Sequence, residues 1–177
     1  MSITNTQLYI SIAIALTLGG ILAYIFWKER QKANVDIKPE LQSDQRTREL
    51  QIHAYERLIL LAERIALPNL ISRVNIPGLA LAEMQTLLTG TIRQEFDHNI
   101  TQQMYVSAEA WNAVRNLKDQ NIHIVNQVAS YLPADASGID LNRALLEMLV
   151  QNPKSALHDV VAEVLSFEAK KVMNIKS

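Results

Sequence analysis

The feature that most constrains this chain is an uncharged apolar run of 20 residues near its N-terminus, Leu8–Trp27. A helix needs about 20 such residues to cross the hydrocarbon core of a bilayer. A buried helix of a soluble protein rarely reaches this length without a charge, and Lys28, Glu29 and Arg30 end the run abruptly. We therefore expect residues 1–27 to form a transmembrane anchor that contacts the lipid bilayer through residues 8–27.

The distribution of cations around the run predicts its orientation. A cleaved signal peptide would need a basic segment before a shorter apolar core, and Met1–Gln7 contains neither Lys nor Arg. Cations follow the run instead, at Lys28, Arg30, Lys32 and Lys38. The positive-inside rule then places the N-terminus outside and the C-terminal domain in the cytoplasm.

Small side chains recur every four residues within the run. They are Ser11, Ala15, Gly19 and Ala23. On a helix they share one face, where a second helix can approach closely. Gly and Ala are also common in membrane spans in general, so both a transmembrane packing face and a chance pattern remain open.

The rest of the chain divides into a polar tether and a helical domain. Residues 28–43 are polar, and Pro39 is expected to prevent one unbroken helix. Residues 44–177 show helical periodicity without an alternating strand pattern. The fold class expected is all-α: an N-terminal transmembrane helix followed by a cytoplasmic antiparallel bundle of about five helices.

The apolar periodicity and the prolines predict where these helices lie. A helix beginning after Ser43 or Asp44 should stop at Pro68, and residues 69–78 should form a turn of helix and a loop. The later helices are expected over residues 79–105, 107–132, 140–151 and 153–173. Gly90 lies inside the second helix, where it predicts either a close helix contact or a break. Ser107 and Asp140 are expected to cap the two helices that follow.

Composition excludes several classes of function. The chain has no cysteine, so disulfides, thiolate nucleophiles and cysteine metal sites are excluded. With 17 Lys and Arg against 18 Asp and Glu, the net charge of −1 gives no reason to expect a nucleic-acid partner. No glycine-rich phosphate loop or nucleophile elbow is present, so no catalytic residue and no cofactor is assigned.

One polar segment of the 79–105 helix is the best candidate for a functional surface. Glu95 and His98 form a Glu-x-x-His pattern, as in di-iron bundles, but such sites need a second copy, and the sequence has none. We therefore assign no metal ligands. With Asn99 and Gln102, these residues make a continuous polar stripe beside the apolar one. The stripe is a candidate interaction patch, a groove between helices, or a solvated face.

Three segments carry a resemblance to a known family. They are AYERLILLAERI from Ala54, IRQEFDHNITQQMYVSAEAW from Ile92 and FEAKKVM from Phe167. They resemble an uncharacterised family of single-span, membrane-anchored helical proteins from Bacteroidota bacteria, over nearly the whole soluble domain. The resemblance implies a bacterial inner membrane location, and it brings no activity and no site residues.

Two functions follow from these expectations. The first is a membrane-anchored cytoplasmic interaction or scaffold module that binds another protein or a second copy of itself. The alternative is a membrane-proximal enzyme or a ligand-binding or metal-binding bundle that uses the Glu95–Gln102 region.

Overall fold

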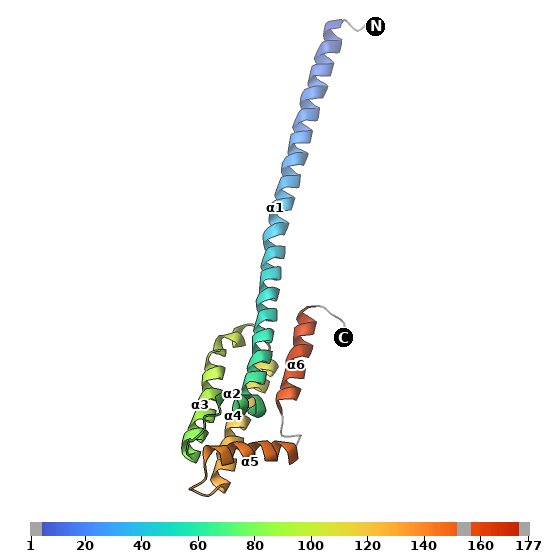
Figure 1. The fold of residues 1–177 in the computed structure, drawn as a ribbon. Coiled ribbons are helices and arrows are strands. Elements are labelled where there is room, and N and C mark those ends of the chain that lie inside the picture. Colours follow the sequence, from blue (N-terminus) through green and yellow to red (C-terminus); the bar gives the residue numbers. More distant parts are fainter. Residues whose placement is uncertain (1–4, 152–156, 174–177) are drawn as a thin grey trace. The chain divides into compact units, whose positions relative to one another are not determined.

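The chain is helical throughout the part that the structure describes. The computed structural model describes the backbone of residues 5–151 and 157–173, and their side chains except those of residues 5–18 and 31–43. In chain order the elements are α1 (Asn5–Ile65), α2 (Leu67–Val74), α3 (Leu81–Asp97), the 3-10 helix η1 (Ile100–Met104), α4 (Ala108–Tyr131), α5 (Gly138–Gln151) and α6 (Leu157–Val172) (Figure 1). The all-α prediction is confirmed for these residues.

The chain forms two compact units, Met1–Thr47 and Arg48–Ser177. In the first unit, the described apolar side chains of α1 are exposed, from Ile21 to Trp27. Within the described residues, no helix is long and apolar enough to cross a membrane. The side chains of residues 8–18, which form more than half of the expected span, lie outside that description.

Helix α1 continues through Pro39, so the prediction that this proline prevents an unbroken helix is wrong. A proline inside a helix removes one hydrogen bond and crowds the preceding turn, at a cost of about 3 kcal/mol. It does not force the chain to leave the helix, because the residues on both sides can still form their own hydrogen bonds. Residues 28–43 are therefore helical.

The second unit begins with the last turns of α1, whose apolar face supplies much of the core. Leu58, Leu61 and Ile65 are fully buried there. Pro68 stops α1 as expected, but it also lies in the first turn of α2, where its missing N–H is not needed. Buried Asn121 of α4 donates from Nδ2 to the carbonyl oxygen of Ile65 (2.7 Å) and so satisfies a group at the end of α1.

Helix α3 differs from the predicted 79–105 helix at two points. Gly90 neither breaks it nor receives a close helix contact, since a Cβ added there would meet no atom within 4 Å. The α-helix ends at Asp97, and the chain continues as η1. The predicted stripe from Glu95 to Gln102 is therefore not continuous on one helix.

Side-chain caps begin the next two helices. Ser107 caps α4 as predicted, since its hydroxyl accepts from the Ala110 N–H (3.0 Å). Helix α5 is capped by Ser137 and not by Asp140. Asp140 lies one turn later, where its carboxylate accepts from the backbone N–H (3.0 Å) and the hydroxyl (2.7 Å) of Ser137. The proposed start of the last helix at Asn152 and Pro153 lies outside the described residues.

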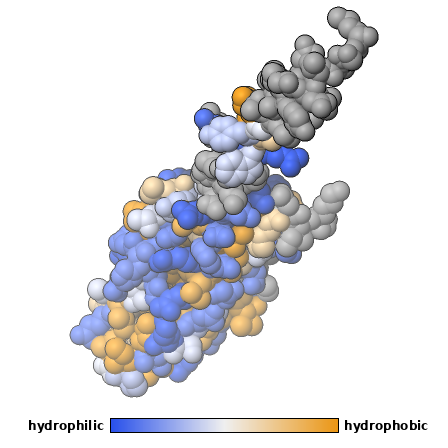
Figure 2. Space-filling model, turned by 90° about the horizontal axis from the view of Figure 1, so that it is seen from above, coloured by the Kyte–Doolittle hydropathy of each residue, from blue (hydrophilic) through white to orange (hydrophobic). Residues whose placement is uncertain are grey.

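The long helices of the second unit alternate in direction around one core. In Figure 1, α3 and α4 run in opposite directions, α6 runs opposite to α4, and α5 lies across their lower ends. The core includes Leu88 and Ile92 of α3, Val114 and Leu117 of α4, and Leu165 of α6. Figure 2 shows one face of the molecule, where hydrophilic side chains dominate this unit and hydrophobic patches interrupt them. The observed bundle thus contains the short helices α2 and η1 in addition to the five helices that the sequence predicted.

Two loops meet where α5 begins. The Gly138 N–H donates to the carbonyl oxygen of Leu79 (2.8 Å), and the Leu81 N–H donates to that of Ala136 (3.3 Å). A Cβ added to Gly138 would lie 2.8 Å from the Cβ of Met84. Only glycine fits this approach without a shift of its neighbours.

Candidate functional site

A groove of about 440 Å³ lies between the last turns of α1 and the end of α3. Its walls are polar and charged, with apolar side chains between them: Arg57, Leu60, Leu61, Arg64, Glu95, His98 and Asn99. We call this feature the α1–α3 groove. It brings together three of the four residues of the predicted patch.

Helical spacing explains why these side chains line one groove. Residues three, four and seven apart lie on the same side of a helix, and Arg57, Leu60 and Arg64 of α1 have this spacing. Glu95, His98 and Asn99 have it at the end of α3. The groove is therefore built from two helix faces that meet at their edges.

A bidentate ion pair joins the two walls. Arg64 donates to Glu95 from Nε (2.8 Å to Oε2) and from Nη2 (2.6 Å to Oε1). Arg73 of α2 adds a contact from its Nη2 to Oε1 of Glu95 (3.2 Å) and donates to the carbonyl oxygen of Arg64 (3.3 Å). Paired N–H donors match the geometry of a carboxylate, which makes this the most specific kind of ion pair. Glu95 thus links α3 to both α1 and α2.

The ion pair keeps Glu95 charged. Its side chain is 15% exposed, whereas that of Arg64 is 46% exposed. The hydrogen bonds from Arg64 lower the pKa of Glu95, burial opposes this shift, and the charges of Arg64, Arg73 and His98 lower it further. The same contact raises the pKa of Arg64. Both groups are therefore ionised at neutral pH.

Asn99 and Arg57 form a second, weaker link across the groove. The Asn99 side chain donates from Nδ2 to the carbonyl oxygen of Glu95 (2.9 Å), which satisfies a free carbonyl in the last turn of α3. Its Oδ1 accepts from Nε of Arg57 at 3.4 Å. This distance is at the long end for a hydrogen bond, so Arg57 is only loosely held.

The remaining two patch residues behave differently from each other. His98 directly follows the last residue of α3 and is exposed at the groove. Gln102 lies on η1, where it is buried and donates from Nε2 to the Thr101 hydroxyl (3.2 Å), and it does not line the groove. The structure therefore groups Glu95, His98 and Asn99 and leaves Gln102 apart.

The charges and shape of the groove favour binding of another molecule's side chains. Arg57 and Arg64 line the groove with a single carboxylate, that of Glu95, which Arg73 also contacts, so the site keeps a positive excess. Leu60 is 58% exposed between Arg57 and Arg64 on α1. Both carboxylate oxygens of Glu95 are engaged by arginines, and no three His, Asp or Glu side chains of the described residues cluster as metal ligands. The arrangement suits a carboxylate beside an apolar side chain.

Sequence reasoning missed the arginines that complete this groove. Arg64 and Glu95 are 31 residues apart, and no spacing rule connects them. The available signal was the row Arg57, Leu60, Arg64 on α1, in which a leucine interrupts a charged face. That row identifies an exposed leucine but not the helix that it faces.

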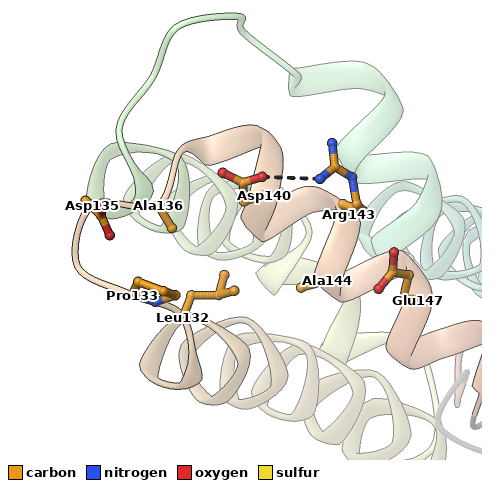
Figure 3. A pocket seen from close by; sticks show the side chains of 8 residues that line it. All are labelled: Leu132, Pro133, Asp135, Ala136, Asp140, Arg143, Ala144 and Glu147. Carbon is orange, nitrogen blue, oxygen red and sulfur yellow. Dashed lines mark hydrogen bonds and ion pairs between the residues drawn. The ribbon is translucent and has the colours of Figure 1, made fainter.

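A second hollow of about 440 Å³ lies beside the start of α5 (Figure 3). In Figure 3 the Asp140–Arg143 pair (3.3 Å) lies on one side, Leu132 and Pro133 lie on the other, and Ala144 lies between them. Hydrogen bonds from Ser137 lower the pKa of Asp140. Its carboxylate already accepts two hydrogen bonds from Ser137 at the start of α5, which leaves the α1–α3 groove as the stronger candidate.

The predicted transmembrane packing face is only partly described. The side chains of Ser11 and Ala15 lie outside the description, while Gly19 and Ala23 are exposed. A Cβ added to Gly19 would meet no atom within 4 Å. An added side chain therefore has room in this single chain.

Comparison with known proteins identifies the family of the chain. Neither the curated proteins nor the solved structures give a match. One family model matches residues 3–172, which include the N-terminal run and nearly all of the helical unit. The chain therefore belongs to this family, the family of unknown function DUF7935.

Proposed function

We propose that the protein is a membrane-anchored interaction module that binds a protein partner in its α1–α3 groove. In this proposal residues 8–27 span a bacterial inner membrane, the N-terminus lies outside, and the helical unit lies in the cytoplasm. The observation that carries the proposal is the exposed Leu60 between two arginines beside a groove whose own carboxylate is neutralised.

The anchor is supported by the sequence run and by the exposure of its described part. Six large apolar residues between Ile21 and Trp27 are exposed, and at 100° per residue they point to all sides of α1. A helix that is apolar all round needs either a protein core or a bilayer around it. The cations Lys28 and Arg30 that follow favour the cytoplasmic side.

The groove is supported as a docking site because some of its side chains are fixed by ion pairs while others are exposed or only loosely held. Arg64, Glu95 and Arg73 are fixed, whereas Leu60, His98 and Arg57 remain available. Binding sites commonly combine an apolar anchor point with a few oriented polar groups. A partner segment with an apolar side chain flanked by carboxylates fits both features.

Capture from membranes tests this function. The full chain with an affinity tag is extracted in detergent, crosslinked and purified as wild type, Leu60→Ser and Leu146→Ser; Leu146 is exposed on α5 and serves as the matched control. We expect one or more proteins to be lost from Leu60→Ser and kept by Leu146→Ser. Identical captured sets would contradict the groove as the docking site. Stoichiometric metal in the wild type, lost in Glu95→Ala, would instead support the enzyme or metal-binding alternative.

Reporter fusions test the orientation separately. A reporter that works only in the cytoplasm, fused after Ser177, should be active, and one that works only outside should be silent. The reverse result would contradict the proposed topology.

A further inference from the structure

Helix α6 carries two apolar faces, and only one of them is used by the core. Val161, Leu165 and Ala169 are buried against the rest of the unit. Val160, Val164 and Phe167 repeat with helical spacing on another side, and they are 56%, 38% and 47% exposed. We call these three residues the α6 stripe. Three large exposed apolar side chains in one row differ from single exposed residues, which are common on protein surfaces.

The α6 stripe has the shape and the rim of a helix-packing surface. A hollow of about 260 Å³ lies along it, lined by the stripe with Glu163 and Glu168. Lys171 extends the row by one turn, and its Nζ lies 4.4 Å from the centroid of the Phe167 ring. The positions 160, 164, 167 and 171 have the alternating four-residue and three-residue spacing of a coiled-coil seam.

The helix that carries the stripe is held firmly in place. The Tyr55 hydroxyl donates to Oε2 of Glu168 (2.7 Å), and the Ser107 hydroxyl donates to the same oxygen (2.6 Å). The Ser107 N–H donates in turn to the Tyr55 oxygen (3.2 Å). These bonds join α1, α4 and α6, so the stripe is presented by a preorganised helix, which lowers the entropic cost of binding.

We propose that the α6 stripe packs against the α6 stripe of a second copy of this chain, with the two helices antiparallel. This pairing places Val164 of each copy against Phe167 of the other and Val160 against the aliphatic stem of Lys171. The two-fold axis then passes between the two α6 helices, at the level of residues 165 and 166. This inference does not depend on the α1–α3 groove.

Charge complementarity selects a second copy and this direction. Glu163 and Lys170 flank the same side of the stripe, at opposite ends of it. In the antiparallel pair, Glu163 of each copy therefore approaches Lys170 of the other, which gives two opposite-charge contacts. In a parallel pair, Glu163 would approach Glu168 of the second copy, and like charges at these positions are unfavourable.

The pair is expected to be weak in solution. One short helix on each side buries less than the roughly 1,000 Å² of a stable interface. The test therefore uses the full chain at high protein concentration in detergent, where two copies are free to meet in either direction.

Cysteine crosslinking tests the pairing directly, because the chain contains no native cysteine. In the antiparallel pair the two copies of residue 164 are offset along the helix axis by about 4.5 Å, and those of residue 160 by about 16 Å. With a short bismaleimide, Val164→Cys should therefore crosslink to itself and Val160→Cys should not. Co-expressed Val160→Cys and Lys171→Cys chains should crosslink to each other. Leu146→Cys, exposed on α5, measures random collisions.

Charge reversal in the Val164→Cys chain tests the rim contacts. Glu163→Lys and Lys170→Glu should each reduce the crosslinked fraction at least threefold, and the double reversal should restore it. Strong self-crosslinking of Val160→Cys would overturn the antiparallel direction. Crosslinking of Val164→Cys no stronger than that of Leu146→Cys, or only to a different protein, would overturn self-association through α6.

Discussion

The two sides of helix α3 solve the same packing problem in different ways. Phe96, on the α4 side, is 7% exposed and packs on Trp111 with ring centroids 5.0 Å apart. Lys118 places its Nζ 4.7 Å from the centroid of the Phe96 ring. Glu95, the preceding residue, faces α1 and α2 and is held by two arginines. The α4 side is closed by apolar packing, and the α1 side is held by charges that leave a groove.

Because of this difference, the α4 side of α3 stabilises the fold, and the α1 side remains accessible to a binding partner. Apolar contacts stabilise only when water is excluded, so the α4 side has to be fully packed. An ion pair persists in contact with water, although it contributes less. The α1 side can therefore remain open, with Leu60 and His98 exposed, without loss of the fold.

The largest effect is expected on the closed side. Phe96→Ala should lower the free energy of unfolding by about 3–5 kcal/mol, because it removes a buried ring and leaves a cavity beside Trp111. Phe167→Ala, at a half-exposed ring of α6, is the matched control and should cost less than about 1 kcal/mol. Urea unfolding of the full chain in detergent, followed by circular dichroism, measures both. Equal losses would show that the α4 side of α3 is not the closed one.

An intermediate effect is expected at the ion pair. Glu95→Gln should lower the free energy of unfolding by about 1–2 kcal/mol, since Arg64 and Arg73 lose a charged partner that is only partly shielded from water. The loss should shrink in high salt, because salt screens the half-exposed Arg64. A loss below that of a surface substitution such as Arg93→Gln would show that the pair does not hold the groove.

The pH dependence of the same variant gives a second measurement. The folded protein lowers the pKa of Glu95, so its stabilising contribution is complete above the ordinary glutamate pKa of 4.5 and is lost as the pH falls through the lowered value. The difference in unfolding free energy between wild type and Glu95→Gln should therefore be constant near neutral pH and shrink below pH 4.5. A difference that grows on acidification would contradict the lowered pKa.

A smaller effect, of opposite sign, is expected at Gly90. This residue lies in α3 with open space around it. Gly90→Ala should raise the free energy of unfolding by about 0.5–1 kcal/mol, because alanine loses less backbone entropy in a helix. Thermal unfolding compares it with the wild type. A destabilised variant would indicate that a neighbour approaches α3 at this point.

The smallest effect on stability is expected at the open groove. His98→Ala should change the free energy of unfolding by less than about 0.5 kcal/mol, as exposed substitutions usually do. Under the proposed function, it should nevertheless reduce crosslinked capture of the partner that Leu60→Ser loses. Unchanged capture would remove His98 from the docking site and leave Leu60 and the arginines to carry it.

Local patterns in the sequence predicted much of the helical unit. The Ser107 cap and the stop at Pro68 both depend on neighbouring residues, and the structure agrees with them. Two local signals misled: Pro39 is accommodated within α1, and Gly90 lies in α3 without a packing role. Proline and glycine each lower the stability of a helix, but they do not prevent it from forming. The residues around them therefore determine whether the helix continues.

Only part of the candidate site could be predicted from the sequence, because its contacts join residues of different helices. Glu95, His98 and Asn99 share a helix face, which spacing can reveal. Their partners Arg57, Arg64 and Arg73 come from α1 and α2, and only the packing of the core brings them near. Helix α3 ends at Asp97, which removes Gln102 from the groove, and the sequence prediction of one helix to residue 105 missed this end.

The contact at Gly138 has a consequence for how this family can vary in length. The loop before α3 and the loop before α5 are joined at Leu79 and Gly138, and Met84 leaves no space for a larger residue between them. Neither loop can lengthen at the joined residues without moving the other. Members of the family with longer connections should therefore carry their additional residues before Leu79 or before Ala136, and should keep a glycine at the start of α5.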